Sequence, residues 1–207
     1  MRNRASRTGV AVGLVVAGAL STTLVPVMAS PAWAAECAYS DSAPSYSHMS
    51  DGARLNHQIR RAVVCLINAE RTKRGLAALK YSPELTTAAL EHTSAAVEQK
   101  WWGPGKDPHT NPQTGSTPQS RIQGAGYCPN PRSWRVAEIV YTGWGEDEGT
   151  AEAAVDWWMH SPPHRANILN PDLRDIGRWV KAGAADPAGT DESGAGTYVV
   201  TFGSCQQ

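Results

Sequence analysis

Residues 158–171 read WMHSPPHRANILNP, and the prolines and histidines of this stretch decide its structure. Pro162 and Pro163 end any helix that enters the stretch, because proline has no backbone N–H to donate and its ring clashes with the preceding turn. His160 and His164 are four residues apart, but the prolines between them prevent the helical face on which both imidazoles would bind one metal ion. We therefore expect a loop after Pro163, and the histidine spacing alone is weak support for a metal site.

The segments around this stretch predict one helix and three strands. Thr150 can cap a short helix that enters the stretch, because its hydroxyl accepts a hydrogen bond from a free N–H of the first turn. Residues 176–181 and 197–202 are rich in β-branched and aromatic residues and predict an antiparallel pair of strands. Residues 135–141 predict a further strand, with Glu138 between two valines on one face.

Helices and one long loop account for the first half of the chain. Apolar residues recur at spacings of three and four, which predicts a helix over about residues 51–74. A capping serine and a proline predict the start of a second helix, over about residues 82–100. Residues 101–117 predict a long loop, a kind of segment that is usually functional, and a short helix follows over residues 118–123. This order of elements indicates an α+β sandwich in which helices cover the sheet.

Several segments resemble the CAP superfamily, which comprises the cysteine-rich secretory proteins, antigen 5 and the pathogenesis-related 1 proteins. Residues 66–71 (LINAER) and 79–85 (LKYSPEL) resemble its opening segment. The middle of the bacterial branch is matched in order by HT at 109–110, GSTP at 115–118, RI at 121–122 and GY at 126–127. The stretch 158–171, followed by Ile176-Gly177, is similar to the hallmark segment of the bacterial secreted branch. The chain is therefore identified as a member of the superfamily over residues 53–203.

The resemblance implies a three-layer α-β-α sandwich with a mostly antiparallel central sheet, the CAP or SCP fold, and a cleft lined by His and Glu side chains. The positions that match the family's site are His109 in the long loop, Glu138 in the strand and His164 after the two prolines. Ala137 and Ile139 replace the Gly and Asn that flank the strand glutamate in the family. The resemblance thus assigns three cleft residues in altered surroundings.

The second cleft glutamate of many eukaryotic members is missing. The position of that glutamate aligns near Ser161 of this chain. We therefore predict that Ser161 lies in the cleft, although a serine does not supply a carboxylate. Glu152 and His160 are two further side chains that could take its place in the cleft. The set of two histidines and two glutamates is therefore incomplete in this chain.

The chemistry of the predicted trio leaves three readings open. Two imidazoles and a carboxylate suit Zn²⁺ or another divalent cation, with one tetrahedral position left for water, and we expect His109, Glu138 and His164 to be its ligands. The same groups could exchange protons as acid and base. They could also hydrogen-bond to one another and orient the loops that carry them.

The N-terminus predicts a secretory signal peptide. Three arginines precede an apolar stretch over residues 10–27, and AWA at 32–34 has the small residues of a cleavage site. We therefore assign residues 1–34 to the signal peptide, 35–52 to an N-terminal arm and 53–207 to the CAP domain. The domain is expected to be secreted and extracellular.

The chain after the signal peptide carries a small net charge. The first 34 residues hold three of the 19 Lys and Arg and none of the 19 Asp and Glu, which leaves 16 basic and 19 acidic side chains and a net charge of −3. This balance gives no electrostatic reason to expect nucleic acid as a partner. No later segment has the length and apolarity for stable membrane insertion.

Four cysteines, Cys37, Cys65, Cys128 and Cys205, follow the predicted cleavage point. In an oxidising compartment an even number predicts two disulfides, for which three pairings are possible. We favour Cys37–Cys65, which would tie the arm to the first helix, and Cys128–Cys205, which would tie a mid-chain loop to the last strand. No two cysteines have the close spacing of a zinc site.

Tryptophans and the remaining histidines have simpler explanations. At least one of Trp157 and Trp158 is expected in the core. The pair at 101–102 borders the long loop and is expected to anchor it, or to edge a groove for lipid or peptide. The histidines at 48, 57 and 92 are expected on polar faces.

These observations predict a monomeric, non-enzymatic binding domain, whose cleft holds the cation and whose surface binds a lipid or an extracellular protein. A metal-assisted hydrolase that cleaves peptides in the same cleft is one alternative. A structural cell-surface protein is the other. The sequence contains no G-x-S-x-G, H-E-x-x-H or Walker motif, which lowers the weight of those enzyme classes.

Overall fold

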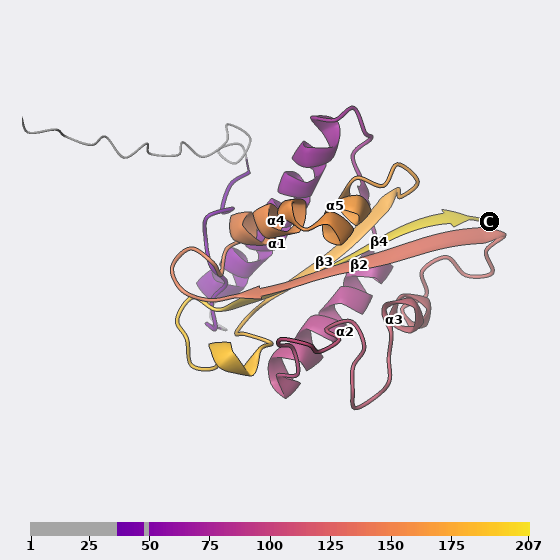
Figure 1. Ribbon diagram of the computed structural model, residues 1–207. Coiled ribbons are helices and arrows are strands. Elements are labelled where there is room, and N and C mark those ends of the chain that lie inside the picture. Colours follow the sequence, from indigo (N-terminus) through magenta and orange to yellow (C-terminus); the bar gives the residue numbers. More distant parts are fainter. Residues whose placement is uncertain (1–36, 48–49) are drawn as a thin grey trace, which may run out of the picture.

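A four-stranded sheet lies between two layers of helices in the computed structural model, which describes residues 37–47 and 50–207 (Figure 1). The elements in chain order are α1 (Ser50–Thr72), β1 (Lys80–Tyr81), α2 (Pro83–Gln99), α3 (Pro118–Gly124), β2 (Ser133–Gly143), α4 (Ala151–His160), α5 (Pro162–Ile168), β3 (Asp175–Ala182), the 3₁₀ helix η1 (Pro187–Gly189) and β4 (Gly196–Gln206). Helices α1, α4 and α5 cover one face of the sheet, and α2 and α3 cover the other. The predicted α+β class and the three-layer arrangement are confirmed.

The predicted signal peptide, residues 1–34, lies outside the described residues, and so does His48. Within the part of the chain that the structure describes, no helix is long and apolar enough to span a bilayer.

Most helices and strands lie where the sequence predicts them. The start of α2 is typical: the hydroxyl of Ser82 accepts a hydrogen bond from the N–H of Leu85 at 3.1 Å, as expected of a capping serine. β2 is longer than the predicted strand by two residues at each end. β1 was not predicted, because a strand of two residues is too short to show an alternating pattern.

The segment after the two prolines is a helix, and the predicted loop was wrong. Pro162 and Pro163 occupy the first two positions of α5. The N–H groups of a helix's first turn have no partner within the helix, so prolines there lose no hydrogen bond, and their fixed φ suits the helix. The same two prolines therefore end α4 and begin α5.

The strands follow the order β1-β3-β4-β2 across the sheet. β4 pairs antiparallel with β2 on one side and with β3 on the other, which confirms the predicted pairing of the last two strands. β1 runs parallel to β3 and pairs only with Asp175 and Ile176. Beyond Ile176, the outer edge of β3 has no strand neighbour among the described residues.

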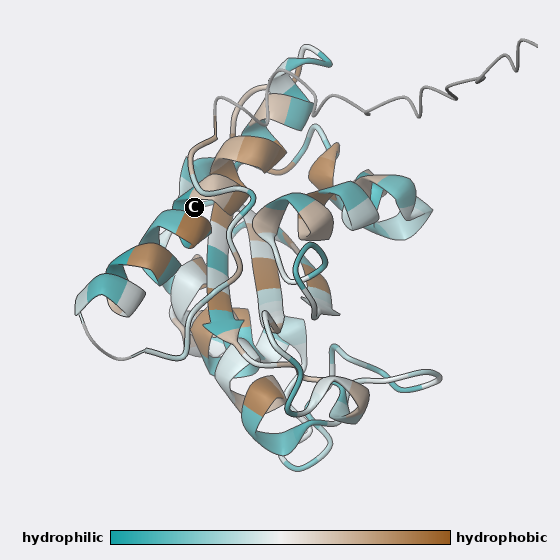
Figure 2. Cartoon of the chain, turned by 90° about the vertical axis from the view of Figure 1, so that its left-hand side faces the viewer, coloured by the Kyte–Doolittle hydropathy of each residue, from teal (hydrophilic) through white to brown (hydrophobic). Residues whose placement is uncertain are grey.

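The side chains of β2 alternate between the two faces of the sheet and meet two different environments. Toward α1 and α4, Ile139 and Tyr141 belong to one large apolar cluster. Toward α2 and α3, Val136 and Val140 belong to two smaller apolar clusters, and Glu138 is the residue between them. Figure 2 shows apolar and polar residues alternating along the helices, as expected for helices that bury one side.

Arg71 near the end of α1 is buried and connects segments that are far apart in the sequence. Its Nη1 donates to the carbonyl oxygens of Ile168 at 2.7 Å and Asn170 at 2.9 Å. Its Nε donates to the carbonyl of Ala77 at 2.9 Å, and Nη2 donates to that of Leu173 at 3.3 Å. A cation at this point supplies donors to carbonyls that the C-terminus of α5 leaves without helical partners.

Both favoured disulfides are present. Cys37 is bonded to Cys65 with a Cα–Cα distance of 5.7 Å, and Cys128 to Cys205 with 5.5 Å. The first holds the N-terminal arm against α1, and the second joins the segment after α3 to the end of β4. The described residues contain no free cysteine.

Gly177 in β3 permits close packing of α2 on the sheet. A Cβ atom at this position would lie 2.2 Å from the carbonyl carbon of Leu85 and from the backbone nitrogen of Thr86. Thr201 on the neighbouring strand donates from its hydroxyl to the carbonyl of Leu85 at 2.8 Å. The first turn of α2 is therefore fixed in backbone contact with the sheet.

Candidate functional site

Glu138 is a buried carboxylate in the middle of β2 on the face covered by α2 and α3. Its side chain is only 1% exposed. Nη2 of Arg121 donates to both carboxylate oxygens, at 3.0 Å each. The Nδ1 atom of His109 lies 3.0 Å from one of these oxygens, and the Nε2 atom of His92 lies 3.8 Å from it. We call these four residues the Glu138 cluster.

Arg121 of α3 joins the carboxylate to the long loop. Its Nη1 donates to the carbonyl of Ser116 at 2.8 Å, and its Nη2 also donates to the carbonyl of His109 at 3.0 Å. α3 is fixed by a reciprocal cap in which Thr117 and Ser120 exchange hydrogen bonds between side chain and backbone. Arg121 therefore holds two points of the loop and neutralises Glu138 with one guanidinium.

His109, which the sequence predicted, contacts Glu138 directly. Its Nδ1–H donates to the carboxylate, and in the neutral form of the ring the lone pair is therefore on Nε2. Its backbone N–H donates to the carboxylate of Asp107 at 2.9 Å, so a local turn orients the residue. The imidazole is one-third exposed. His109 is the member of the cluster that reaches solvent.

His92 is buried, so its predicted place on a polar face was wrong. It is on α2, and its Nε2–H donates to the carbonyl of Pro108 at 2.8 Å. Burial lowers the pKa of His92, partly offset by the charge of Glu138, so the ring is neutral near pH 7. Its spacing of three and four residues from Ala89 and Ala96 places it on the buried stripe of the helix, and this was the signal in the sequence.

Arg121 was missed for a different reason. In the sequence, Arg121 stands out only as part of the family resemblance, because an arginine in the last turn of a short helix is commonly a surface residue. Its burial depends on the meeting of α3, the long loop and β2, which come from separate parts of the chain. Nothing in the local sequence predicts that meeting.

His164, the third predicted residue, is at the third position of α5 and does not contact Glu138. Its Nδ1 lies 2.7 Å from the hydroxyl oxygen of Ser161, and its ring packs against Trp157 in a tilted arrangement with a centroid distance of 4.9 Å. Burial lowers the pKa of His164, and the charge of His109 lowers it further. The two imidazoles are thus near enough to interact, although His164 and Ser161 form a pair of their own.

The two proposed substitutes for the missing glutamate lie elsewhere. His160 is largely exposed and contacts Asp156 one turn before it, with Nδ1 2.9 Å from the backbone carbonyl. Glu152 is in the first turn of α4 and makes no contact with the Glu138 cluster among the described residues. Neither side chain completes the predicted set.

The predicted trio does not fit together as a metal site. Across residues 37–47 and 50–207, no group of three or more His, Cys, Asp or Glu side chains is arranged to hold one ion. Both oxygens of Glu138 are engaged by the guanidinium of Arg121, whose positive charge opposes a second cation on the same carboxylate. The Nε2 atoms of His109 and His164 remain available.

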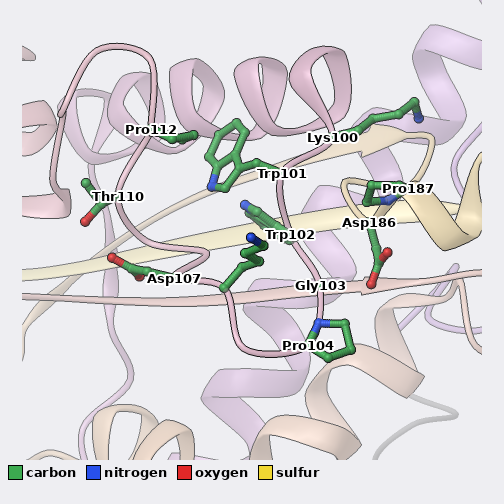
Figure 3. A pocket seen from close by; sticks show the side chains of 11 residues that line it. Lys100, Trp101, Trp102, Gly103, Pro104, Asp107, Thr110, Pro112, Asp186 and Pro187 are labelled. Atoms are coloured by element: carbon green, nitrogen blue, oxygen red, sulfur yellow. The ribbon is translucent and has the colours of Figure 1, made fainter.

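A pocket of about 670 Å³ lies beside the Glu138 cluster (Figure 3). Trp101 and Trp102 form its wall, and Asp107 and Thr110, further along the same long loop, also line it. The rings of Trp101 and Trp102 are T-shaped at a centroid distance of 6.3 Å, and both contact the ring of His92, at 5.6 Å and 5.9 Å. The tryptophans therefore anchor the loop and also line a cavity.

The polar atoms around this pocket are incompletely paired. The indole nitrogens of Trp101 and Trp102 and the Nδ1 atom of His92 are buried and have no hydrogen-bond partner among the described residues.

The prediction for the other tryptophan pair, Trp157 and Trp158, is confirmed, since Trp158 is fully buried while Trp157 is about half exposed.

Comparison with known proteins agrees with the architecture. The profile described as the cysteine-rich secretory protein family, CAP, matches residues 64–201. A curated relative, the uncharacterized protein YkwD of Bacillus subtilis, is 30% identical over 125 residues, which is 60% of this chain and 43% of the relative. The chain thus spans less than half the length of that relative.

Two solved structures share the fold. One is an extracellular protein containing an SCP domain from Bacillus anthracis, with a TM-score of 0.58 and 18% identity, over 79% of this chain and 45% of that one. The other is an outer surface protein from Borrelia burgdorferi, with a TM-score of 0.54 and 23% identity, over 72% of this chain and 94% of that one.

Proposed function

Because the chain belongs to the cysteine-rich secretory protein family, CAP, we propose that it is an extracellular, non-catalytic binding domain whose ligand is a lipid with an anionic head group. The observation that carries the proposal is the pocket beside the long loop, whose walls are formed by Trp101 and Trp102. Its volume is in the range of small-molecule sites, and apolar walls with few polar groups are typical of them.

The pocket lining includes one lysine that can contact an anionic head group. Two acidic and two basic side chains line the pocket. Asp107 accepts from the backbone of His109, Asp186 accepts from that of Ala188, and Lys100 donates to the carbonyl of Ala184. Lys106 also lines the pocket, is exposed and forms no ion pair within the described part of the chain. The head group is expected at Lys106, with the apolar chain against the tryptophans.

The Glu138 cluster supports binding in preference to catalysis. Arg121 donates to both oxygens of the carboxylate and the side chain is only 1% exposed, so a substrate has little access to it as a base. The same guanidinium holds the loop that borders the pocket. In this proposal the cluster is the support that fixes the shape of the binding site.

Secretion is supported by two disulfides, which persist in oxidising compartments, together with the predicted signal peptide and the family membership.

Calorimetric titration with oleate tests the lipid proposal. Thr110→Trp adds bulk to the pocket lining and should weaken oleate binding about tenfold or more. Gln113→Trp is the matched control, because residue 113 is on the same loop, is exposed and does not line the pocket. Dodecylamine, with an apolar chain and a cationic head, should bind more weakly than oleate. Equal affinity of both Trp variants for oleate would exclude this pocket as the lipid site.

A divalent cation remains a second candidate ligand, with His109 and His164 as its protein ligands. The Nδ1 atoms of both rings are engaged, by Glu138 and Ser161, and such contacts orient imidazoles whose Nε2 atoms bind metal. Calorimetry with Zn²⁺ should then show binding that is lost in His109→Ala and in His164→Ala and retained in His160→Ala. Undiminished binding in the first two variants would remove this site.

A further inference from the structure

A groove of about 600 Å³ follows the open edge of β3, between α1 and α2. Its walls include Arg60 of α1 and Val97 of α2, and its floor is formed by residues 179–182. The N-terminal arm closes one end, where Asn56 holds Ser45 through two hydrogen bonds of 2.8 Å. The groove shares no lining residue with the pocket that Trp101 and Trp102 line.

The floor of this groove presents backbone groups without partners. The N–H of Ser82, after β1, donates to the carbonyl of Ile176, so Ile176 points its backbone groups away from β4. Alternate residues of a strand share this direction. The backbone groups of Arg178, Val180 and Ala182 therefore point outward from this edge, and Val180 and Ala182 line the groove. Within the described residues nothing hydrogen-bonds to these backbone groups. Unpaired N–H and C=O groups along the edge of a sheet are a template for pairing with another chain.

A strand already fits at this edge. β1 pairs with the first two residues of β3 along the same outer side, between the layers of α1 and α2 (Figure 1). After Tyr81 the chain turns away into α2, and the edge continues without a neighbour. An extended chain added there would continue the line of β1.

The charges beside the edge are positive and lack carboxylate partners. The guanidinium of Arg60 lies over the ring of Trp179 at 3.9 Å, and Arg178 donates from Nε to the carbonyl of Arg60 at 3.1 Å. Neither arginine forms an ion pair within the described part of the chain. The acidic residue that lines the groove, Glu98, is already paired with Lys181 at 3.0 Å.

We propose that this groove binds an acidic peptide in extended conformation, which adds to the outer edge of β3 as a new strand. Backbone hydrogen bonds to Arg178, Val180 and Ala182 supply the pairing, as in other cases where a peptide extends a sheet. Acidic side chains of the peptide meet Arg60 and Arg178. The Trp179 ring, covered by Arg60, forms part of the floor beneath them.

Three synthetic hexapeptides, acetylated and amidated, test the proposal by calorimetry. The first alternates Glu and Val, and the second alternates Lys and Val. The third is the Glu–Val peptide with methyl groups on the backbone nitrogens of every second residue, which removes the N–H groups that would pair with β3. The Glu–Val peptide should bind, the Lys–Val peptide should bind at least about tenfold more weakly, and N-methylation should cost a similar factor. Equal affinity for the N-methylated peptide would overturn strand addition, and so would failure of the Glu–Val peptide to bind.

Variants of the protein locate the site. Arg60→Glu should weaken binding of the Glu–Val peptide at least about tenfold. Arg132→Glu, an equal charge reversal at the exposed residue just before β2, should change it less than about twofold. Ala182 lies opposite Gly196 of β4, but by the alternation from Ile176 its N–H points away from β4. Ala182→Pro removes this outward N–H and should also weaken binding. Oleate affinity should be unchanged in Arg60→Glu, which separates this proposal from the lipid site. An equal loss in both charge reversals would contradict the assignment to the groove.

Discussion

The two faces of the sheet bury different kinds of side chain. Toward α1, α4 and α5 the core is one apolar cluster that includes Ile139 and Trp158. Toward α2 and α3 the apolar residues form two smaller clusters, and the Glu138 cluster lies between them on β2. The apolar core is thus continuous on one face of the sheet, whereas on the other face Glu138 divides it into two parts. The divided face also carries the long loop and the pocket. The buried polar residues of the Glu138 cluster and the proposed binding site therefore lie on the same side of the sheet.

The largest effect is expected where the divided face depends on one cation. Arg121→Ala should destabilise the protein by about 4 kcal/mol, because it leaves a buried carboxylate without its partner. Urea denaturation measures this change. The double variant Arg121→Met with Glu138→Leu should recover most of the loss, since an apolar pair of similar size replaces the ion pair. A single variant with native stability would show that Glu138 finds other partners or water.

An apolar deletion on the continuous face should have the next largest effect. Ile139→Ala removes a fully buried side chain from the large cluster and should cost about 3 kcal/mol. Ile139→Val should cost about 1 kcal/mol, because it removes one methylene. This loss should be the same at pH 5.5 and pH 7.5, because neither substitution removes a titrating group, and denaturation at both values checks it.

The close contact between α2 and the sheet should be sensitive to a single methyl group. Gly177→Ala places a carbon against the backbone of Leu85 and Thr86 and should destabilise the fold by about 2 kcal/mol. The matched change Gly124→Ala, at the end of α3 where a Cβ meets no atom within 4 Å, should be close to neutral. A neutral result for Gly177→Ala would mean that α2 can move away from β3 at little cost.

The smallest effect is a pH dependence of stability to which His92, on the divided face, contributes. Burial holds the pKa of His92 below its ordinary value of 6.5, so the folded protein binds its proton less readily than the unfolded chain does. Stability is therefore unaffected above pH 6.5 and falls as pH decreases from 6.5 toward the lowered pKa, by about 1 kcal/mol at most at pH 5.5.

His92→Gln should reduce this slope, since an uncharged amide can donate to Pro108 in place of the ring. His57→Gln, on the exposed side of α1, is the control. His164 has a lowered pKa as well and contributes in the same direction, so some slope should persist. A His92→Gln variant with the full slope would contradict the assignment.

The helices and the three long strands could be predicted because their signals are local. Ser82 and Thr150 cap helices at the expected positions, and alternation in β2 placed Glu138 on one face with two valines. The start of α5 was misread because prolines were treated only as terminators, although they suit a first turn.

The predicted site was partly recovered. His109 and Glu138 are in contact, but His164 pairs with Ser161, and Arg121 takes the position at the carboxylate that a metal was expected to hold. The family resemblance supplies positions, whereas the choice of partner for a buried carboxylate depends on contacts between distant segments. Such contacts leave no periodicity in the sequence.

The buried guanidinium of Arg71 has a consequence for the order in which the chain acquires its structure. α5 has seven residues, too few to be stable as an isolated helix, and its last carbonyl groups are held by a residue 97 positions earlier. The segment with the hallmark sequence therefore cannot assemble by itself during synthesis and takes its shape only after α1 has docked. A truncated chain that lacks α1 should leave Ser161 and His164 in an unstructured segment.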